Sequence, residues 1–297
     1  MDTKELLKKV RQIELSIRGV VNEVFAGEYH SVFKGRGMEF AEVREYEVGD
    51  DIRTIDWNVS ARMNHPYVKV FDEERELTVM ILFDISSSES FGSRNQVKGA
   101  VAIEIAALLA SSAIRNNDKV GLIIFSDKVD KFVAPRKGRK HILRVVRELL
   151  YFATVSQERT GSQTNIAEAL EYMNQILKRR ATVFLISDFL AEGFEKDLQI
   201  ANNRHDLVAL RLIDPLEQQL PQVGLIEFED LETGETVLVD TSYQEIRRSV
   251  AENAGMHKSK LDKTFKSIGI DYIDIHTEKS YIKPLTRFFR ARAKRFH

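Results

Sequence analysis

An apolar run that ends on an acid and two hydroxyl residues constrains this chain most. Residues 78–83 read TVMILF, with no helical period, and Asp84, Ser86 and Ser88 follow. Such a run predicts a strand buried on both faces of a mostly parallel sheet. In open parallel sheets, ligands bind in the crevice beyond the carboxyl ends of the strands. The carboxylate and hydroxyl oxygens are hard ligands, which suit Mg²⁺, Mn²⁺ or Ca²⁺ rather than zinc.

Strands and helices alternate from this run to the end of the chain. Further strands are predicted at residues 120–125, 182–186, 207–213 and 272–275, and residues 128–134 are expected to pair locally with the first of these. Helices are predicted at about 95–114, 139–152, 165–178, 194–202 and 244–268, and from about 281. Strands separated by helices of this length imply right-handed crossovers. The predicted fold class is therefore α/β, with a doubly wound, mostly parallel, Rossmann-like sheet.

The first 77 residues differ in character from the rest. A helix is predicted over 3–26 and short strands with ordered loops over 28–77, including a strand at 67–71. We expect residues 1–77 to form an extension that packs on a main domain of residues 78–297. Within the main domain, two short alternating runs predict a hairpin at about 223–239.

Arginines, aspartates and the single tryptophan cluster in this extension. They form either a binding patch or an internal network that holds irregular backbone, and we favour the network. Its polar members are Arg44, Arg53, Arg62, Asp50, Asp51 and Asp56, and its expected buried anchors are Phe40, Ile55 and Trp57.

Composition narrows the function classes. A formal net charge of −1 over 297 residues argues against a dedicated nucleic-acid binder. The chain has no cysteine, so disulfides, thiolate metal sites and cysteine nucleophiles are excluded. No stretch approaches the roughly 18 apolar residues of a membrane span. The first residues lack the apolar core of a secretion signal, so we expect a cytoplasmic protein.

Two later residues strengthen the interpretation of the acid and hydroxyl string as a metal site. Alone, serines before a helix are often only N-caps. However, Thr164 leads into a predicted helix, and Asp188 ends the predicted strand at 182–186. If that strand neighbours the one at 78–83, Asp84 and Asp188 emerge side by side. Two carboxylates, three hydroxyls and waters suit an octahedral oxygen shell.

The full series, Asp84-x-Ser86-x-Ser88, then Thr164, then Asp188, resembles the metal-ion-dependent adhesion site of von Willebrand factor A domains. That resemblance implies a von Willebrand A-like sheet. It also implies that the first aspartate and the serines touch the metal, that the threonine binds directly or through water, and that the last aspartate binds through water. One coordination position would stay open for a carboxylate of a protein partner.

A second resemblance covers nearly the whole chain. Residues 35–62 read GRGMEFAEVREYEVGDDIRTIDWNVSAR and precede the metal-site strand. This series is similar to the signature of the bacterial domain-of-unknown-function family number fifty-eight. The matching positions are Gly35, Arg36, Gly37, Glu39, Phe40, Arg44, Tyr46, Gly49, Asp50, Asp51, Arg53, Ile55, Asp56, Trp57, Ser60, Ala61 and Arg62.

This second resemblance implies an adaptor or co-chaperone that works with a MoxR-type AAA+ ATPase, and not a catalyst. Two departures from the family pattern stand out. Many relatives begin with membrane helices, which this chain lacks. Members commonly carry Met after the third metal-site residue, where this chain has Glu89. That carboxylate either strengthens cation binding or discourages an acidic ligand, and the sequence leaves both open.

Two other functions are compatible with the same residues. One is a metal-dependent hydrolase that uses the same cation. The other is a scaffold whose site no longer binds metal. The sequence has no nucleophile elbow and no phosphate-binding loop, and His65, His141, His205 and His276 lie on segments away from the expected ligands.

The C-terminal segment also allows two interpretations. It is locally basic, which is compatible with contact to an anionic membrane surface or to nucleic acid. Its apolar residues, Leu285, Phe288, Phe289 and Phe296, share about one helical face. We favour a helix that docks on the sheet and leaves its basic side in solvent.

Overall fold

The computed structural model describes residues 12–13, 39–72, 77–86, 98–156, 164–229 and 236–295. Contacts divide the chain into two compact units. One is Phe33–Leu77, and the other contains Thr78–His297 together with Met1–Val32. The helix predicted over 3–26 lies almost entirely outside the described residues. The assignment of residues 1–77 to one extension, and its packing on the main domain, stay predictions.

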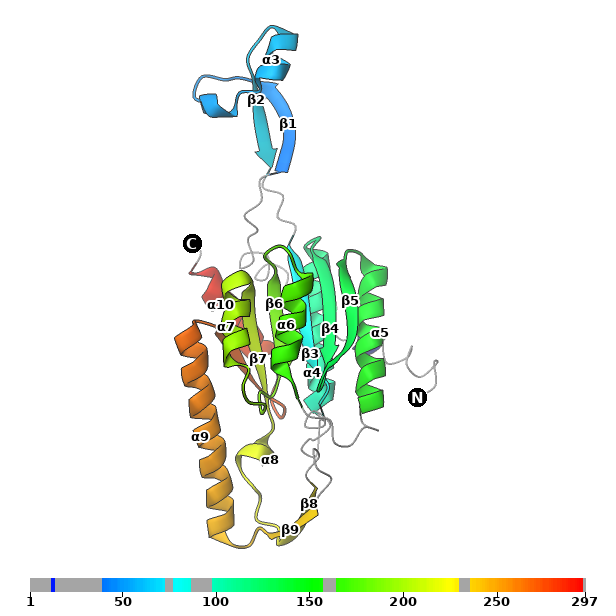
Figure 1. Ribbon diagram of the computed structural model, residues 1–297, viewed down its shortest axis with the longest axis vertical. Helices are drawn as coiled ribbons and strands as arrows, with labels where there is room; N and C mark the ends of the chain where they lie inside the picture. The colour runs from blue at the N-terminus through cyan, green and yellow to red at the C-terminus, as the bar shows by residue number, and fades with distance from the viewer. Residues whose placement is uncertain are drawn as a thin grey trace. The chain divides into compact units, whose positions relative to one another are not determined.

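The larger unit is built on a six-stranded sheet in the order β10-β7-β6-β3-β4-β5 (Figure 1). Its strands are β3 (Thr78–Asp84), β4 (Lys119–Phe125), β5 (Val129–Arg136), β6 (Thr182–Ser187), β7 (Asp206–Ile213) and β10 (Asp271–His276). All neighbours are parallel except β5, which pairs antiparallel with β4. Central strands β3 and β6 are buried along almost their whole length, as their unbroken apolar runs predict.

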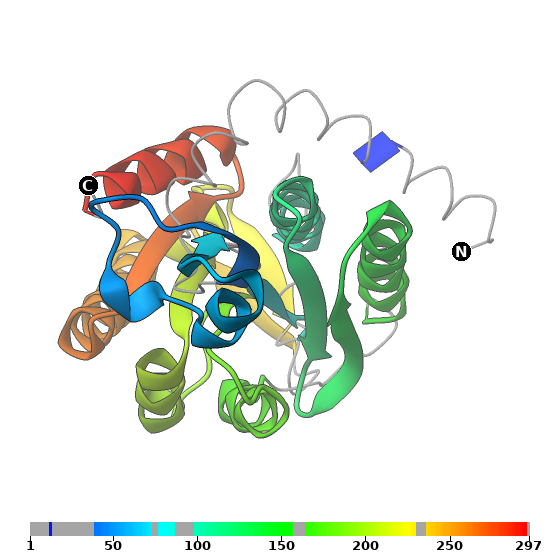
Figure 2. The same ribbon diagram turned by 90° about the horizontal axis from the view of Figure 1, so that it is seen from above.

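Helices cover both faces of this sheet. They are α4 (Lys98–Arg115), α5 (Arg139–Ser156), α6 (Ile166–Ile176), α7 (Glu195–Arg204), α9 (Gln244–Ile268) and α10 (Ile282–Ala293). Figure 2 shows α4, α5 and α10 along one face and α6, α7 and α9 along the other. The predicted doubly wound, mostly parallel α/β sheet is confirmed. Among the described residues, no helix is long and apolar enough to cross a membrane.

Alternate residues of β3 supply the core. Met80 and Leu82 belong to a buried cluster that also includes Leu170 of α6, Leu198 of α7 and Phe265 of α9. The side chains of a strand point alternately to opposite faces of the sheet. A strand with an unbroken apolar run can therefore pack against helices on both faces.

The C-terminal helix docks on the sheet, as predicted. Leu285 and Phe289 of α10 are fully buried, and the ring of Phe289 lies edge-on to Phe184 of β6, with centroids 6.5 Å apart. Arg292 is 5% exposed and pairs with Asp206. At least one basic residue of this helix is therefore used inside the fold. Phe296 lies outside the described residues.

Two smaller elements follow β7. The four-residue helix α8 (Pro215–Gln218) was not predicted, although Asp214 and Glu217 form a capping box around its start. The predicted hairpin is confirmed as β8 (Leu225–Glu229) and β9 (Thr236–Asp240), which pair antiparallel.

The smaller unit contains β1 (Glu39–Glu45), the 3₁₀ helix η2 (Ile52–Thr54), α3 (Trp57–Met63) and β2 (Tyr67–Asp72), with β1 and β2 antiparallel. Part of the predicted polar network is present. Arg44 makes a bidentate ion pair with Asp50, with N–O distances of 2.6 and 2.8 Å. Asp51 caps η2 and Asp56 caps α3.

The prediction that Trp57 is a buried anchor is wrong. Trp57 is 69% exposed, and α3 has no buried residue. A two-stranded sheet with one short helix offers too little apolar surface to enclose an indole ring. Ile55 is half-buried and bridges to the buried Val68, and the side chain of Phe40 lies outside the described residues.

Candidate functional site

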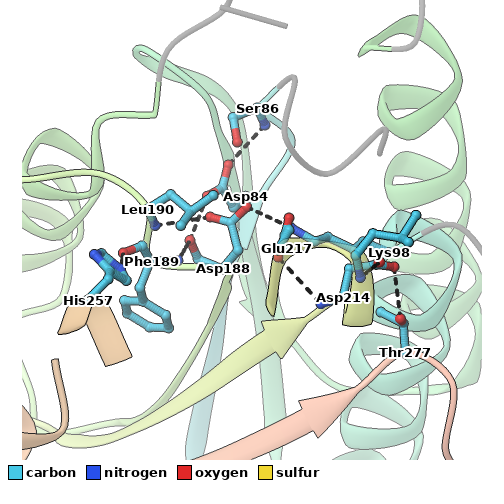
Figure 3. A network of polar contacts seen from close by, with 12 residues as sticks. Asp84, Ser86, Lys98, Asp188, Phe189, Leu190, Asp214, Glu217, His257 and Thr277 are labelled. Carbon is cyan, nitrogen blue, oxygen red and sulfur yellow. Dashed lines mark hydrogen bonds and ion pairs between the residues drawn. The ribbon is translucent and has the colours of Figure 1, made fainter. Parts of the chain in front are cut away.

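Two aspartates meet at the carboxyl ends of neighbouring strands. Strands β3 and β6 are parallel, with Phe83 opposite Ile186, so Asp84 at the end of β3 lies beside the residues that follow β6. Asp84 is 1% exposed and Asp188 is 4% exposed. Figure 3 shows both side chains in one polar network. The strand at 182–186 does neighbour the strand at 78–83, and the expectation that Asp84 and Asp188 lie side by side is confirmed.

The carboxylate of Asp84 accepts hydrogen bonds from Ser86 and Ser187. The backbone N–H of Ser86 donates to Oδ1 at 2.9 Å, and the Ser187 hydroxyl donates to Oδ2 at 2.7 Å. Burial, together with the negative charge of Asp188, raises the pKa of Asp84 to about 7. A cation bound at this carboxylate would favour its ionised form, because it would offset both causes of the raised pKa.

The position of Asp188 is fixed by an unusual backbone. Phe189 has a φ of +59°, the left-handed region that a bulky residue rarely adopts. Its N–H donates to the Ser187 hydroxyl at 3.0 Å, and its carbonyl accepts from Nε2 of His257 at 3.1 Å. The N–H of Leu190 donates to Oδ1 of Asp188 at 3.2 Å. Backbone of this kind costs on the order of 1–3 kcal/mol and is typically found at functional sites.

A buried lysine joins the same network. Lys98 of α4 is fully buried, and its Nζ lies 3.1 Å from Oδ2 of Asp188. The same ammonium pairs with Oε1 of Glu217 in α8. Burial raises the pKa of Glu217, and Lys98 opposes that rise. Figure 3 shows Lys98 between these acids, with Asp214 and Thr277 close by.

Sequence reasoning did not identify Lys98, Ser187 or Glu217 as members of the site. For two of them a signal was available. Lys98 falls at helical spacing with Val101, Ala102 and Ile105, so it lies on the buried side of its helix. Glu217 stands at the last position of the capping box that begins at Asp214.

The remaining predicted ligands have different outcomes. Thr164 is half-buried and directly precedes Asn165, whose backbone N–H donates to the carbonyl of Ser126 at 2.8 Å. Because Ser126 follows β4, Thr164 belongs to the same edge of the sheet as Asp84. Ser88 and Glu89 lie outside the described residues.

The predicted ligand set depends on hydroxyl oxygens as well as acids. Within the described ranges, no group of three or more His, Asp or Glu side chains is arranged to hold a metal ion. The predicted set instead combines two carboxylates with the hydroxyls of Ser86 and Thr164, and with Ser88 beyond the described part.

A cavity of about 340 Å³ opens beside Asp188. Its apolar wall includes Leu190, Leu212 and Val250, and its polar lining includes Glu217 and His257. A mainly apolar hollow with a few polar groups is a common form of binding site. The site therefore combines a buried pair of acids with adjacent space for a ligand side chain.

Comparisons with known proteins agree with the sequence resemblance. A family model described as "Protein of unknown function DUF58" matches residues 42–260. The uncharacterized protein Rv1480 of Mycobacterium tuberculosis is 28% identical over 296 residues, which are 99% of this chain and 92% of that protein. YeaD of Bacillus subtilis, also uncharacterized, is 27% identical over 109 residues, 37% of this chain and 25% of that protein.

Two solved structures show distant similarity to this chain. BatB from Bacteroides thetaiotaomicron has 16% identity and a TM-score of 0.47, covering 73% of this chain and 99% of that one. The VWA domain of SpRpn10 has 11% identity and a TM-score of 0.37, covering 73% and 95%. At these scores neither structure bears on the function. The family model spans more than half of the chain, and this protein therefore belongs to the DUF58 family.

Proposed function

We propose that this protein is a divalent-cation-dependent protein-interaction module. One observation carries the proposal: Asp84 and Asp188, far apart in sequence, are both buried at the carboxyl ends of adjacent parallel strands. Keeping acids in such a place is costly unless a cation or hydrogen bonds compensate them.

The donor chemistry fits Mg²⁺, with Mn²⁺ or Ca²⁺ as alternatives. Asp84, Ser86, Thr164 and Asp188 present oxygen atoms only, and Ser88 adds one more by sequence. The raised pKa of Asp84 supports this assignment, because its causes, burial and a nearby like charge, are those a bound cation offsets. When bound, the cation would supply a position at which a carboxylate from another protein completes its coordination.

The cavity beside Asp188 suits a protein partner. A side chain next to the incoming Asp or Glu would find an apolar wall at Leu190 and Leu212. The family resemblance suggests a MoxR-type AAA+ ATPase or its client as that partner, with this chain as a cytoplasmic adaptor or co-chaperone. We propose no catalytic role. A hydrolase or a scaffold without metal is the rival interpretation.

Capture of a MoxR-type ATPase on the immobilised protein tests this proposal. We expect capture in Mg²⁺ that falls at least about tenfold in chelator and in Asp84→Asn. Asp118→Asn is the matched control, since Asp118 is also buried, at 2% exposure, but precedes β4 at the opposite edge of the sheet. Capture that is equal with and without chelator would contradict the proposal, and turnover of a phosphoester that needs Asp84 and Mg²⁺ would favour the hydrolase.

A further inference from the structure

We infer that Lys98 is an internal cation that competes with the divalent ion for Asp188. This inference rests on the proposed function, because it concerns the same site. It adds a residue that sets the affinity of the site for the ion, and it explains why a fully buried lysine stands among carboxylates.

The position of Lys98 is unfavourable for a cation on its own. The side chain has no exposed surface, and burying an ammonium group away from water is costly. The acids around the ammonium must offset this cost, and Asp188 and Glu217 make direct ion pairs with it.

The ammonium of Lys98 and the proposed divalent ion would both bind the carboxylate of Asp188. Nζ of Lys98 lies 3.1 Å from Oδ2 of Asp188. A divalent ion that uses Asp188, directly or through water, would therefore stand close to the ammonium. In a buried site the repulsion between two such charges is weakly screened. Either the ion binds less tightly than the acids alone would allow, or the ammonium moves toward its second partner.

Glu217 is that second partner. It pairs with Lys98 now, and its side chain is 26% exposed, so it can keep the ammonium when the ion takes Asp188. Glu217 belongs to α8, which is followed in the chain by the hairpin β8–β9. Occupation of the cation site would then strengthen the link between α4 and α8.

Titration of the metal-stripped protein with Mn²⁺, with the free ion followed by electron paramagnetic resonance, tests this inference. We expect Lys98→Met to bind Mn²⁺ at least about tenfold more tightly than the parent, because a competing charge is removed. Lys119→Met is the matched control. It removes one positive charge from an exposed position at the start of β4, and its affinity should equal that of the parent.

A second variant covers the case in which Lys98→Met does not fold. Glu217→Gln should weaken Mn²⁺ binding, because the ammonium loses a charged partner that competes with Asp188 for it. Mn²⁺ binding by Glu217→Gln that is as tight as binding by the parent would overturn the inference. Where Lys98→Met folds, the loss should also shrink when Glu217→Gln is made in the Lys98→Met background, and an equal loss in both backgrounds would overturn the inference as well.

The outcomes separate this inference from the proposed function. Saturable binding in the parent with no gain in folded Lys98→Met would overturn the inference alone. Binding in Lys98→Met but none in the parent would support it, with the lysine excluding the ion. No saturable binding in either protein would overturn both.

Discussion

His205 illustrates how burial changes the chemistry of a single side chain in this fold. It is 2% exposed, and its Nδ1 accepts a hydrogen bond from the Ala181 N–H at 3.3 Å. Burial, with smaller effects from the positive charges of Arg204 and Arg180, lowers the pKa of His205 to about 4. The folded protein therefore holds this imidazole neutral well below the usual pKa of histidine.

The first prediction concerns acid stability. The unfolded chain takes up a proton at His205 near pH 6.5 and the folded chain only near pH 4, so the stabilising contribution is present above about pH 6.5 and is lost as the pH falls between these values. His205→Asn keeps an acceptor but cannot titrate. Between pH 7 and 4.5, the parent should lose about 2 kcal/mol more unfolding free energy than this variant, measured by urea denaturation.

The control for this prediction is His65→Asn, because His65 is exposed. It should follow the pH dependence of the parent. If His205→Asn also followed the parent between pH 7 and 4.5, the argument from burial would be wrong.

Site residues that belong to a local sequence motif could be predicted from the sequence. Site residues whose position depends on tertiary packing could not. Asp84 and Asp188 follow apolar runs, so each could be placed at a strand end from the sequence. Lys98 and Ser187 were missed, since their roles depend on which strands are neighbours in the sheet and on which residues α4 brings to the ends of those strands. The cluster of arginines and aspartates around Trp57 predicts a buried anchor, but the surrounding elements are too small to enclose its side chain.

At the scale of elements, helix α10 is attached to the sheet mainly by one aromatic residue. Phe289 is fully buried and contacts Phe184 of the sheet and Phe288 of its own helix. Leu285, one turn earlier, is also fully buried. The helix is amphipathic, and its attachment to the sheet depends on this narrow apolar stripe.

The second prediction tests this attachment. Phe289→Ala removes a ring from a closed part of the core and should lower the unfolding free energy by about 3 kcal/mol. The matched control is Arg287→Ala in the same helix, which is exposed and should change it by less than about 0.5 kcal/mol. Urea denaturation at pH 7 measures both, and a loss below about 1 kcal/mol for Phe289→Ala would show that α10 is not held in this way.

Most elements of the larger unit were predictable because their periodicity is strong. The apolar runs of β3, β4, β6 and β7 and the long helix α9 lie within one or two residues of their expected bounds. Helix α8 was missed because four residues give no periodicity, and its only signal is the capping box. In the smaller unit, η2 and α3 were missed for the same reason: each is short, and their aspartate caps are the main local signal.

At the scale of the whole molecule, the site exists only because of the sheet order. Strand β6 lies next to β3, although α4, β4, β5, α5 and α6 separate them in the chain. This crossover brings Ser187 to Asp84, 103 residues away, and places Asp188 beside Lys98 and Glu217. The sequence predicts two strand ends and their acids, and the topology makes them one site.

The most direct test of the central claim is calorimetric titration of the metal-stripped protein with Mg²⁺ and Mn²⁺. We predict saturable binding with about one ion per chain in the parent and in Asp118→Asn, and none in Asp84→Asn. Circular dichroism should show that all three proteins are folded. Saturable binding that persists in folded Asp84→Asn would contradict the account, because the ion would then not be held by the carboxylate at the end of β3.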